Sequence, residues 1–270
     1  TWLEHEGAPD IVHVSNAFLM GLAGKLRRDL GCRILCSLQD EAGWVDGMRA
    51  EYQERVWNMM AETAQHVDAF IGVSDWYANL MSKKLRIPAD RLHTIYPGVP
   101  IPQLASVGEP PGLAIGYLSR LSDSLGLGCI VEAFLQLKTD PKHSELKLYA
   151  AGGMTQDDEG DVAAALTKIE KAGVASDVTL LRKFDPAARG SFLSKLSVLS
   201  VPVPGGEAFG MYIPEAWSYG IPVVQPAVGA FVELLGKFGG GDLYSPDDTG
   251  ALAAALDSLL SQPERRATLG

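Results

Sequence analysis

Short apolar runs alternate with longer amphipathic segments along the whole chain. In the first hundred residues the apolar runs predict strands, and the mixed segments between them predict helices. The predicted strands are residues 11–14, 33–37, 69–73 and 92–95, and the predicted helices are residues 16–30, 50–67 and 75–85. Ser74 directly precedes the last of these helices, where its hydroxyl can accept a hydrogen bond from an early helical N–H. Strands that alternate with helices in this way indicate βαβ units and a parallel sheet.

The alternation restarts after a segment that is rich in proline and glycine. Residues 98–112 contain four prolines and three glycines, which is typical of a linker. Beyond it the predicted strands are residues 113–117, 146–151, 178–181, 198–203 and 221–225, and the predicted helices are residues 128–137, 161–172, 189–196 and a last one capped by Thr249. The pattern predicts an α/β protein with two Rossmann-like, parallel-sheet domains and a cleft between them. The expected division is a first domain at 1–99, a linker at 100–112 and a second domain at 113–270.

Composition and charge narrow the class of protein. Of the 270 residues, 47% are hydrophobic and 21% are charged, the balance of an ordinary globular protein. The formal net charge of −10 argues against a nucleic-acid partner, because there is no basic patch to release counterions. No apolar run reaches the length of a transmembrane helix. Cys32, Cys36 and Cys129 form no Cys-x-x-Cys pair, which argues against a disulfide framework or a zinc site and favours a reducing cytoplasm.

One glycine-rich segment, residues 205–229, carries the densest set of candidate functional residues. It places Glu207 and Glu215 eight residues apart, between a buried strand and a second strand that follows a glycine stop. Pro214 lies where it can open a helix, since a proline in the first turn costs no hydrogen bond. The N–H groups of residues 210–212 would then be available to an anion. The predicted order is strand, glycine loop, helix and strand, and open α/β sheets bind ligands in loops at the carboxyl ends of their strands.

This segment closely resembles the Glu-x7-Glu motif of group 1 (family 4) retaining glycosyltransferases. Four further features resemble the same family: Arg120 in Gly-Tyr-Leu-Ser-Arg-Leu, Val73-Ser74 before a helix, the turn Tyr96-Pro97-Gly98-Val99, and Gly229-Ala230 with Glu233. The resemblance runs from about residue 10 to the end and implies the GT-B architecture. It also implies a fragment with an incomplete first domain, because family members carry several βαβ units before this point and a C-terminal helix that crosses back.

The resemblance implies transfer of a sugar from a nucleotide-diphospho-sugar to an acceptor hydroxyl, with retention of the anomeric configuration. Arg120 would bind the diphosphate, since a guanidinium is a planar fork of donors for phosphate oxygens. Glu207 would accept hydrogen bonds from the donor sugar, and Glu215 from both ribose hydroxyls. The remaining donor-site residues would be Phe209, Gly210, Met211 and Gly229. Taken alone, Glu215 would be assigned as a helix-dipole partner and Arg120 as a surface charge.

On the acceptor side the resemblance points to the residues after the strand at 33–37. Gln39 stands where many members have a histidine. It cannot titrate, but it can hydrogen-bond a hydroxyl. The expected catalytic residues are therefore Arg120, Glu207 and Gln39. Asp40 and Glu41 either orient an acceptor or face solvent. His13 is either a strand histidine or a residue that lines the cleft.

The chain also departs from the family pattern. The family usually has a lysine five residues after the arginine, and here that position is Leu125. Lys183 is one candidate substitute, although an exposed lysine is the simpler assignment. The departures leave open a catalytically inactive relative that binds a nucleotide sugar or a protein, or a GT-B epimerase or phosphorylase.

The expected partners are a nucleotide-sugar donor and a carbohydrate or lipid-linked acceptor. No cofactor is expected, because the nucleotide sugar is itself a substrate, and the family's chemistry implies no metal. The expected location is the cytoplasm, with scope for peripheral attachment to a membrane.

Overall fold

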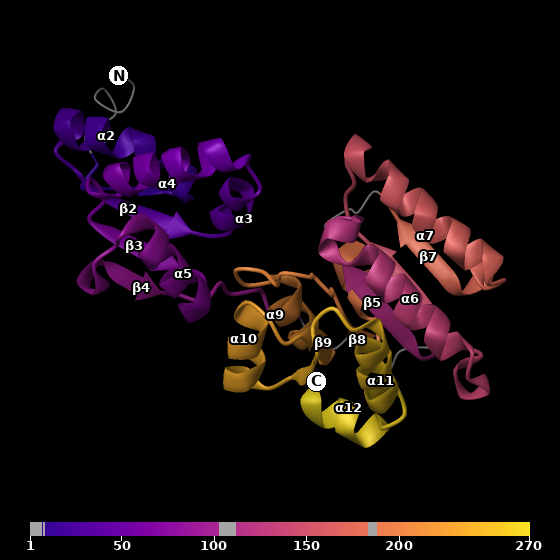
Figure 1. Ribbon diagram of the computed structural model, residues 1–270. Helices are drawn as coiled ribbons and strands as arrows, with labels where there is room; N and C mark the ends of the chain where they lie inside the picture. Colours follow the sequence, from indigo (N-terminus) through magenta and orange to yellow (C-terminus); the bar gives the residue numbers. More distant parts are fainter. Residues whose placement is uncertain (1–6, 8, 103–111, 183–187) are drawn as a thin grey trace. The chain divides into compact units, whose positions relative to one another are not determined.

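The computed structural model describes residues 7, 9–102, 112–182 and 188–270, which form two compact units. The first unit comprises the described residues up to Pro97 together with Glu207–Phe209, and the second comprises Gly98–Gly206 and Gly210–Gly270. Figure 1 shows that each unit is a sheet with helices packed against it. Most of the expected linker, residues 103–111, and Lys183 lie outside the described residues.

The sheet of the first unit is parallel throughout. Its strands are β1 (Ile11–Val14), β2 (Arg33–Leu38), β3 (Ala69–Gly72) and β4 (Leu92–Thr94), in that spatial order. The helical elements are η1 (Ala17–Leu22), α2 (Ala23–Leu30), α3 (Glu41–Asp46), α4 (Ala50–Ala64), α5 (Asp75–Leu85) and η2 (Ala89–Arg91). The largest buried side chains of this core are Met20, Ile34, Leu38, Phe70, Tyr77, Met81 and Leu85.

The second unit is a six-stranded parallel sheet. Its strands are β5 (Ala114–Leu118), β6 (Lys147–Ala151), β7 (Val178–Leu181), β8 (Val198–Leu199), β9 (Val223–Pro226) and β10 (Gly241–Tyr244). The order across the sheet is β10-β9-β8-β5-β6-β7. The chain therefore builds outward from β5 through β6 and β7, and then outward from β8 on the other side. The strand order reverses between β5 and β8, which makes that point the topological switch point.

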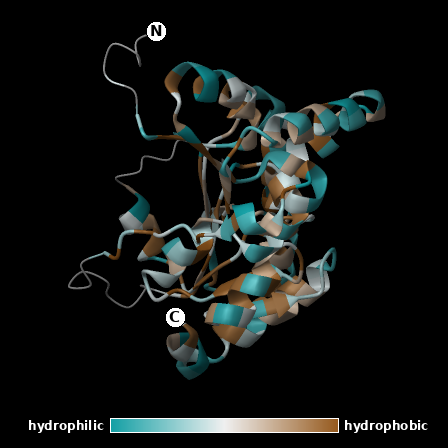
Figure 2. Cartoon of the chain, turned by 90° about the vertical axis from the view of Figure 1, so that its left-hand side faces the viewer, coloured by the Kyte–Doolittle hydropathy of each residue, from teal (hydrophilic) through white to brown (hydrophobic). Residues whose placement is uncertain are grey.

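The helices of the second unit pack against this sheet or against one another. They are α6 (Leu127–Lys138), α7 (Glu159–Lys171), α8 (Arg189–Leu193), α9 (Tyr212–Trp217), α10 (Ala230–Phe238), α11 (Thr249–Leu260) and α12 (Pro263–Leu269). In Figure 2 hydrophilic and hydrophobic colours alternate along the helices, as expected for segments with one buried face. Within the described parts of the chain, no helix is long and apolar enough to cross a membrane.

The expected α/β class with two parallel-sheet domains is confirmed, and several element boundaries are corrected. Ser74 caps α5 as predicted, with its Oγ 3.0 Å from the Tyr77 N–H. Thr249 is not the cap of α11; Asp248 precedes it and accepts from the Ala251 N–H at 2.9 Å. The expected strand at 198–203 is regular only over Val198–Leu199, because its pairing with β9 is limited to Leu199 opposite Val223.

Among the α-helices and strands that the structure describes in the second unit, α10, β10 and α12 were not predicted. Tertiary contacts require glycine at two positions where β10 begins. A Cβ on Gly240 would lie 2.3 Å from Trp217 Nε1, and one on Gly241 would lie 2.1 Å from the Val223 carbonyl oxygen. Trp217 Nε1 donates to the Gly240 carbonyl at 2.8 Å, so the glycines let β10 begin beside β9 and α9.

Candidate functional site

A cavity of about 350 Å³ lies at the carboxyl ends of β5 and β6, beside the switch point. Its lining comes from four parts of the second unit: the turn after β5, the turn after β6, the start of α8, and α9 with the residue before it. The lining residues are Leu118, Ser119, Arg120, Ala151, Gly152, Gly153, Arg189, Met211, Tyr212 and Glu215. The strand order therefore leads to a cavity where open α/β sheets bind their ligands.

The floor of this cavity is formed by two turns that approach very closely. A Cβ on Gly152 would lie 1.8 Å from the Ser119 carbonyl oxygen, so only glycine fits there. The Ser119 N–H donates to the Ala151 carbonyl at 3.1 Å, and the Leu121 N–H donates to the Gly153 carbonyl at 2.9 Å. These glycines were not predicted as site residues. Their sequence signal was a glycine pair directly after a predicted strand.

Arg120 lies on the wall of the cavity and is held by two polar neighbours. Its Nη2 donates to Ser124 Oγ at 3.3 Å, and its Nε lies 3.7 Å from Asp158 Oδ2. The Asp158 side chain is only 6% exposed and accepts from the N–H and the hydroxyl of Thr155. The Thr155 backbone bond is the main reason that the pKa of Asp158 is lowered, and Arg120 adds to it. A fixed negative charge thus orients a guanidinium whose side chain remains 43% exposed.

Position 125 adds no charge to the cavity. Leu125 ends a short 3-10 turn, Asp123–Leu125, and is not among the lining residues. Its carbonyl lies 3.2 Å from the Tyr117 hydroxyl, which also donates to the Arg120 carbonyl at 2.7 Å. The backbone of this turn is therefore held beside Arg120, while the side chain is aliphatic where the family pattern would place a cation.

Glu215 lies on α9 and forms an ion pair with Arg189 at the start of α8. Arg189 Nη1 donates to Glu215 Oε1. The Glu215 side chain is 15% exposed and that of Arg189 is 42% exposed. Burial raises the pKa of Glu215, and the Arg189 charge and hydrogen bond oppose that rise. Arg189 was not predicted as a site residue, because nothing in the sequence connects the start of that helix with a carboxylate 26 positions later.

Only one of the next three expected donor-site residues, Met211, Gly210 and Gly229, is among the described residues that line the cavity. Met211 lines the cavity, with 41% of its surface exposed. Gly210 and Gly229 do not line it, and both adopt positive φ, +84° and +60° respectively. Gly229 precedes α10 and packs against Gly206, where a Cβ would lie 2.9 Å from the Gly229 Cα. The expected anion site on the N–H groups of residues 210–212 stays a prediction. The helix behind it, α9, has only six residues, so its dipole is short.

Glu207 and Phe209 belong to the first unit and do not line the cavity. The Phe209 ring lies 6.2 Å from the Tyr96 ring, centroid to centroid. Between the two, Ala208 is buried in the first core, and its carbonyl accepts from Ser74 Oγ at 2.7 Å. The structure therefore brings Arg120, Met211 and Glu215 together and leaves Glu207 and Phe209 in another unit.

Gln39 also lies in the first unit, in a hydrogen-bonded group at the carboxyl end of β2. Its Nε2 donates to the Ser15 carbonyl at 2.7 Å, which fixes the amide. The centre of the group is Glu41, which is 3% exposed and accepts from the N–H groups of Ala17 and Gln39 and from the Tyr77 hydroxyl. A solvent-facing Glu41 was one of the two alternatives from the sequence, and it is wrong.

Asp40 is the titratable candidate of this group. Burial is the main cause of its raised pKa, and the nearby Glu41 charge adds to it. A hydrogen bond from the Ala208 backbone opposes the rise. A carboxyl with a raised pKa beside a fixed glutamine amide is suited to orienting a hydroxyl. His13, in β1, is engaged with Ser37 Oγ at 2.8 Å.

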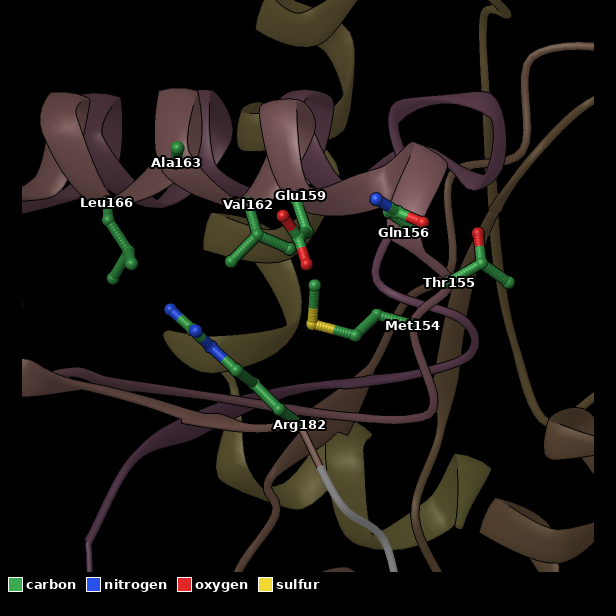
Figure 3. Close-up of a pocket in the computed structure, with 8 residues that line it drawn as sticks. All are labelled: Met154, Thr155, Gln156, Glu159, Val162, Ala163, Leu166 and Arg182. Atoms are coloured by element: carbon green, nitrogen blue, oxygen red, sulfur yellow. The ribbon is translucent and has the colours of Figure 1, made fainter.

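A second cavity of about 700 Å³ lies beside α7 in the second unit (Figure 3). Met154 and Arg182 extend toward α7, and Glu159, Val162 and Leu166 point from that helix into the space between them. Its described lining contains none of the expected site residues and has a single cationic side chain, Arg182, whereas Arg120 and Arg189 both line the first cavity. Its residues Met154 and Thr155 directly follow Gly153, so one turn borders both cavities.

Comparison with known proteins assigns the family. Residues 112–262 match the family described as "Glycosyl transferases group 1", and residues 1–102 match "Glycosyltransferase Family 4". Two curated relatives are a phosphatidyl-myo-inositol mannosyltransferase from Mycolicibacterium smegmatis, 34% identical over 36% of this chain, and D-inositol 3-phosphate glycosyltransferase 2 from Catenulispora acidiphila, 23% identical over 75% of it. The matched regions cover 26% and 50% of those proteins, so the chain spans at most about half of their length.

Solved structures support the same fold. HepE from Anabaena in complex with UDP superposes with a TM-score of 0.83 at 18% identity, over 99% of this chain and 73% of HepE. Sucrose-phosphate synthase from Thermosynechococcus elongatus gives 0.77 at 20% identity, over 96% of this chain and 66% of the synthase. These likenesses show the GT-B fold of two parallel-sheet domains. Because the family match spans more than half of its residues, the chain belongs to the group 1 glycosyl transferases.

Proposed function

We propose that this chain binds a nucleotide-diphospho-sugar in the cavity at Arg120 and takes part in transferring its sugar to an acceptor hydroxyl with retention of configuration. The observation that supports this is the pairing of a guanidinium and a carboxylate in one cavity at the switch point of a parallel sheet. A guanidinium matches the oxygens of a diphosphate, and a carboxylate matches the two hydroxyls of a ribose. The curated relatives and the solved HepE complex with UDP are consistent with such a donor.

In the proposed reaction, the bond from the anomeric carbon to the diphosphate oxygen breaks, and a bond from that carbon to the acceptor oxygen forms on the same face. The departing diphosphate takes up the proton of the acceptor hydroxyl. Negative charge develops on the diphosphate, and Arg120 stabilises it there, because its guanidinium is already oriented by Asp158. No metal is assigned in this scheme, since the guanidinium supplies the positive charge.

The remaining roles are proposals carried by the family resemblance. Glu207 would accept hydrogen bonds from the donor sugar, and Phe209, Gly210, Met211 and Gly229 would complete the donor site. Gln39 and Asp40 would orient the acceptor, a carbohydrate or a lipid-linked sugar. A glutamine that is already bonded to the Ser15 carbonyl can still accept a hydrogen bond through its amide oxygen.

Replacing Glu215 by alanine is expected to weaken binding of a nucleoside diphosphate about 30-fold, or about 2 kcal/mol, because charge-assisted bonds to the ribose are lost. Calorimetric titration with UDP, GDP and ADP and their sugar derivatives measures this. The 2′-deoxy diphosphate sharpens the test. It should bind the wild type more weakly than the ribonucleotide does, and the two should bind Glu215→Ala almost equally.

Asp242→Ala is the matched control for this variant. Asp242 also pairs with an arginine in the second unit, Arg265, but it does not line the cavity. It should leave nucleotide affinity unchanged. If the deoxy and ribo ligands keep the same affinity ratio in Glu215→Ala as in the wild type, the ribose assignment is wrong.

A catalytically inactive relative is the second candidate, and Leu125 is the observation that favours it. Leu125→Lys would add the cation that the family pattern contains. Sugar transfer or donor hydrolysis that rises in this variant would support a weakened enzyme. If no nucleotide sugar or free diphosphate binds the wild-type chain at all, nucleotide binding by the chain is excluded.

A further inference from the structure

The Arg189 side chain contacts the Glu215 carboxylate and also lines the cavity. One side of its guanidinium donates to Glu215 through Nη1. The side chain also lines the cavity and is 42% exposed, whereas its carboxylate partner is 15% exposed. A guanidinium has five N–H donors in a planar fork, which allows it to bind more than one group. Arg189 is thus placed to serve a buried carboxylate and a ligand together.

A diphosphate bound in this cavity would carry more negative charge than the single guanidinium of Arg120 balances. Of the lining residues that the structure describes, Arg120, Arg189 and Glu215 are charged. Two guanidiniums and one carboxylate give these described residues a net positive charge, in a chain whose formal charge is −10. Arg120 is itself drawn toward Asp158, and position 125 is aliphatic. Without Arg189, the described lining would offer the phosphates of a nucleoside diphosphate one guanidinium, which is already paired with Asp158.

We propose that Arg189 is a second phosphate-binding residue of this cavity, and that the same guanidinium holds Glu215 in position for the ribose. The inference rests on the proposed function and assigns a role to a residue that the family motifs do not mark. One planar group would then connect the two parts of a bound nucleotide: its phosphates on the exposed edge and its sugar through Glu215. Arg189 would supply the charge that Leu125 does not.

The test compares UDP with UMP, each titrated calorimetrically against the wild type and Arg189→Met, with GDP/GMP and ADP/AMP in parallel. The second phosphate should contribute less affinity in the variant, so the ratio of diphosphate to monophosphate affinity is expected to fall about 10-fold. A pH of about 8 keeps Glu215 ionised even though the variant removes the charge that opposes the rise in its pKa.

Arg265→Met and Arg189→Lys complete the design. Arg265 pairs with Asp242 at similar exposures, 39% and 22%, outside the cavity, so its replacement should leave the affinity ratio unchanged. Arg189→Lys keeps a charge and should retain most of the ratio. Thermal unfolding of each variant checks that the second unit stays folded.

Two outcomes would overturn the inference, and they differ from a failure of the proposed function. If Arg189→Met weakens UDP and UMP by the same factor, Arg189 acts only through Glu215. If neither affinity changes, it has no part in binding. If the wild type binds none of the nucleotides, the proposed nucleotide site itself fails, and the inference fails with it.

Discussion

Replacing Arg120 by methionine is expected to weaken binding of a nucleoside diphosphate about 100-fold, or about 2.7 kcal/mol. The guanidinium lines the cavity, is 43% exposed and is oriented by Ser124 and Asp158, so it can meet a phosphate without reorganising. Methionine keeps the length of the side chain and removes every donor. Calorimetric titration with UDP, GDP and ADP measures the loss, and the monophosphates should lose less.

The controls separate charge from geometry. Arg120→Lys should give an intermediate loss, because an ammonium supplies a point charge without the planar fork. Arg265→Met makes the same chemical change at an ion pair outside the cavity and should bind like the wild type. Asp158 still accepts from Thr155 in the Arg120 variants, so the turn beside α7 should remain folded. Wild-type affinity in Arg120→Met would remove this residue from the site.

Replacing Glu41 by alanine is expected to destabilise the first unit by about 3 kcal/mol or more. Glu41 is 3% exposed and accepts three hydrogen bonds, from the Ala17 N–H at 2.7 Å, the Gln39 N–H at 2.9 Å and the Tyr77 hydroxyl at 2.9 Å. Each donor would lose its partner, at a cost of about 1–3 kcal/mol for a buried group. Urea unfolding followed by circular dichroism measures the loss in free energy of unfolding.

Glu41→Gln and Glu51→Ala test this explanation. The glutamine keeps one acceptor oxygen in the same place, so it should recover part of the lost stability. Glu51 lies on α4 of the same unit with 61% of its side chain exposed, and its replacement should change stability by less than about 0.5 kcal/mol. Wild-type stability in Glu41→Ala would mean that water replaces the carboxylate without cost. The Glu41→Ala change would also remove the hydrogen-bond acceptor of the Gln39 N–H.

The first unit shows how far local sequence signals reach. The segments at 11–14, 69–73 and 92–95 became β1, β3 and β4 with at most a one-residue change, because short runs of strand-forming residues are a local signal. The short helix α3 was not predicted. It begins at Glu41, whose acidic side chain suggested solvent, and only the arrangement of Ala17, Gln39 and Tyr77 around it makes its burial favourable.

The candidate site also contains residues that the sequence indicated and one that it did not. Arg120 and Glu215 were expected in the site because their segments resemble the family's motifs; without that resemblance they would be a surface charge and a helix-dipole partner. The structure brings Arg120 and Glu215 to one cavity and leaves Glu207 in the other unit. Arg189 could not be identified, because its ion pair with Glu215 depends on how α8 and α9 pack beside the same turns.

The sequence by itself determined the alternation of strands and helices, the parallel sheets and the residue types available for a phosphate and a sugar. These follow from the spacing of apolar residues and from side-chain chemistry, which are local properties. Tertiary structure alone decided the strand order β10-β9-β8-β5-β6-β7, and with it the switch point where the turns after β5 and β6 meet. It also decided that Gly152 packs on the Ser119 carbonyl and that Arg189 reaches Glu215. Such contacts join residues that are distant in sequence, and only the packing of complete elements determines which of them meet.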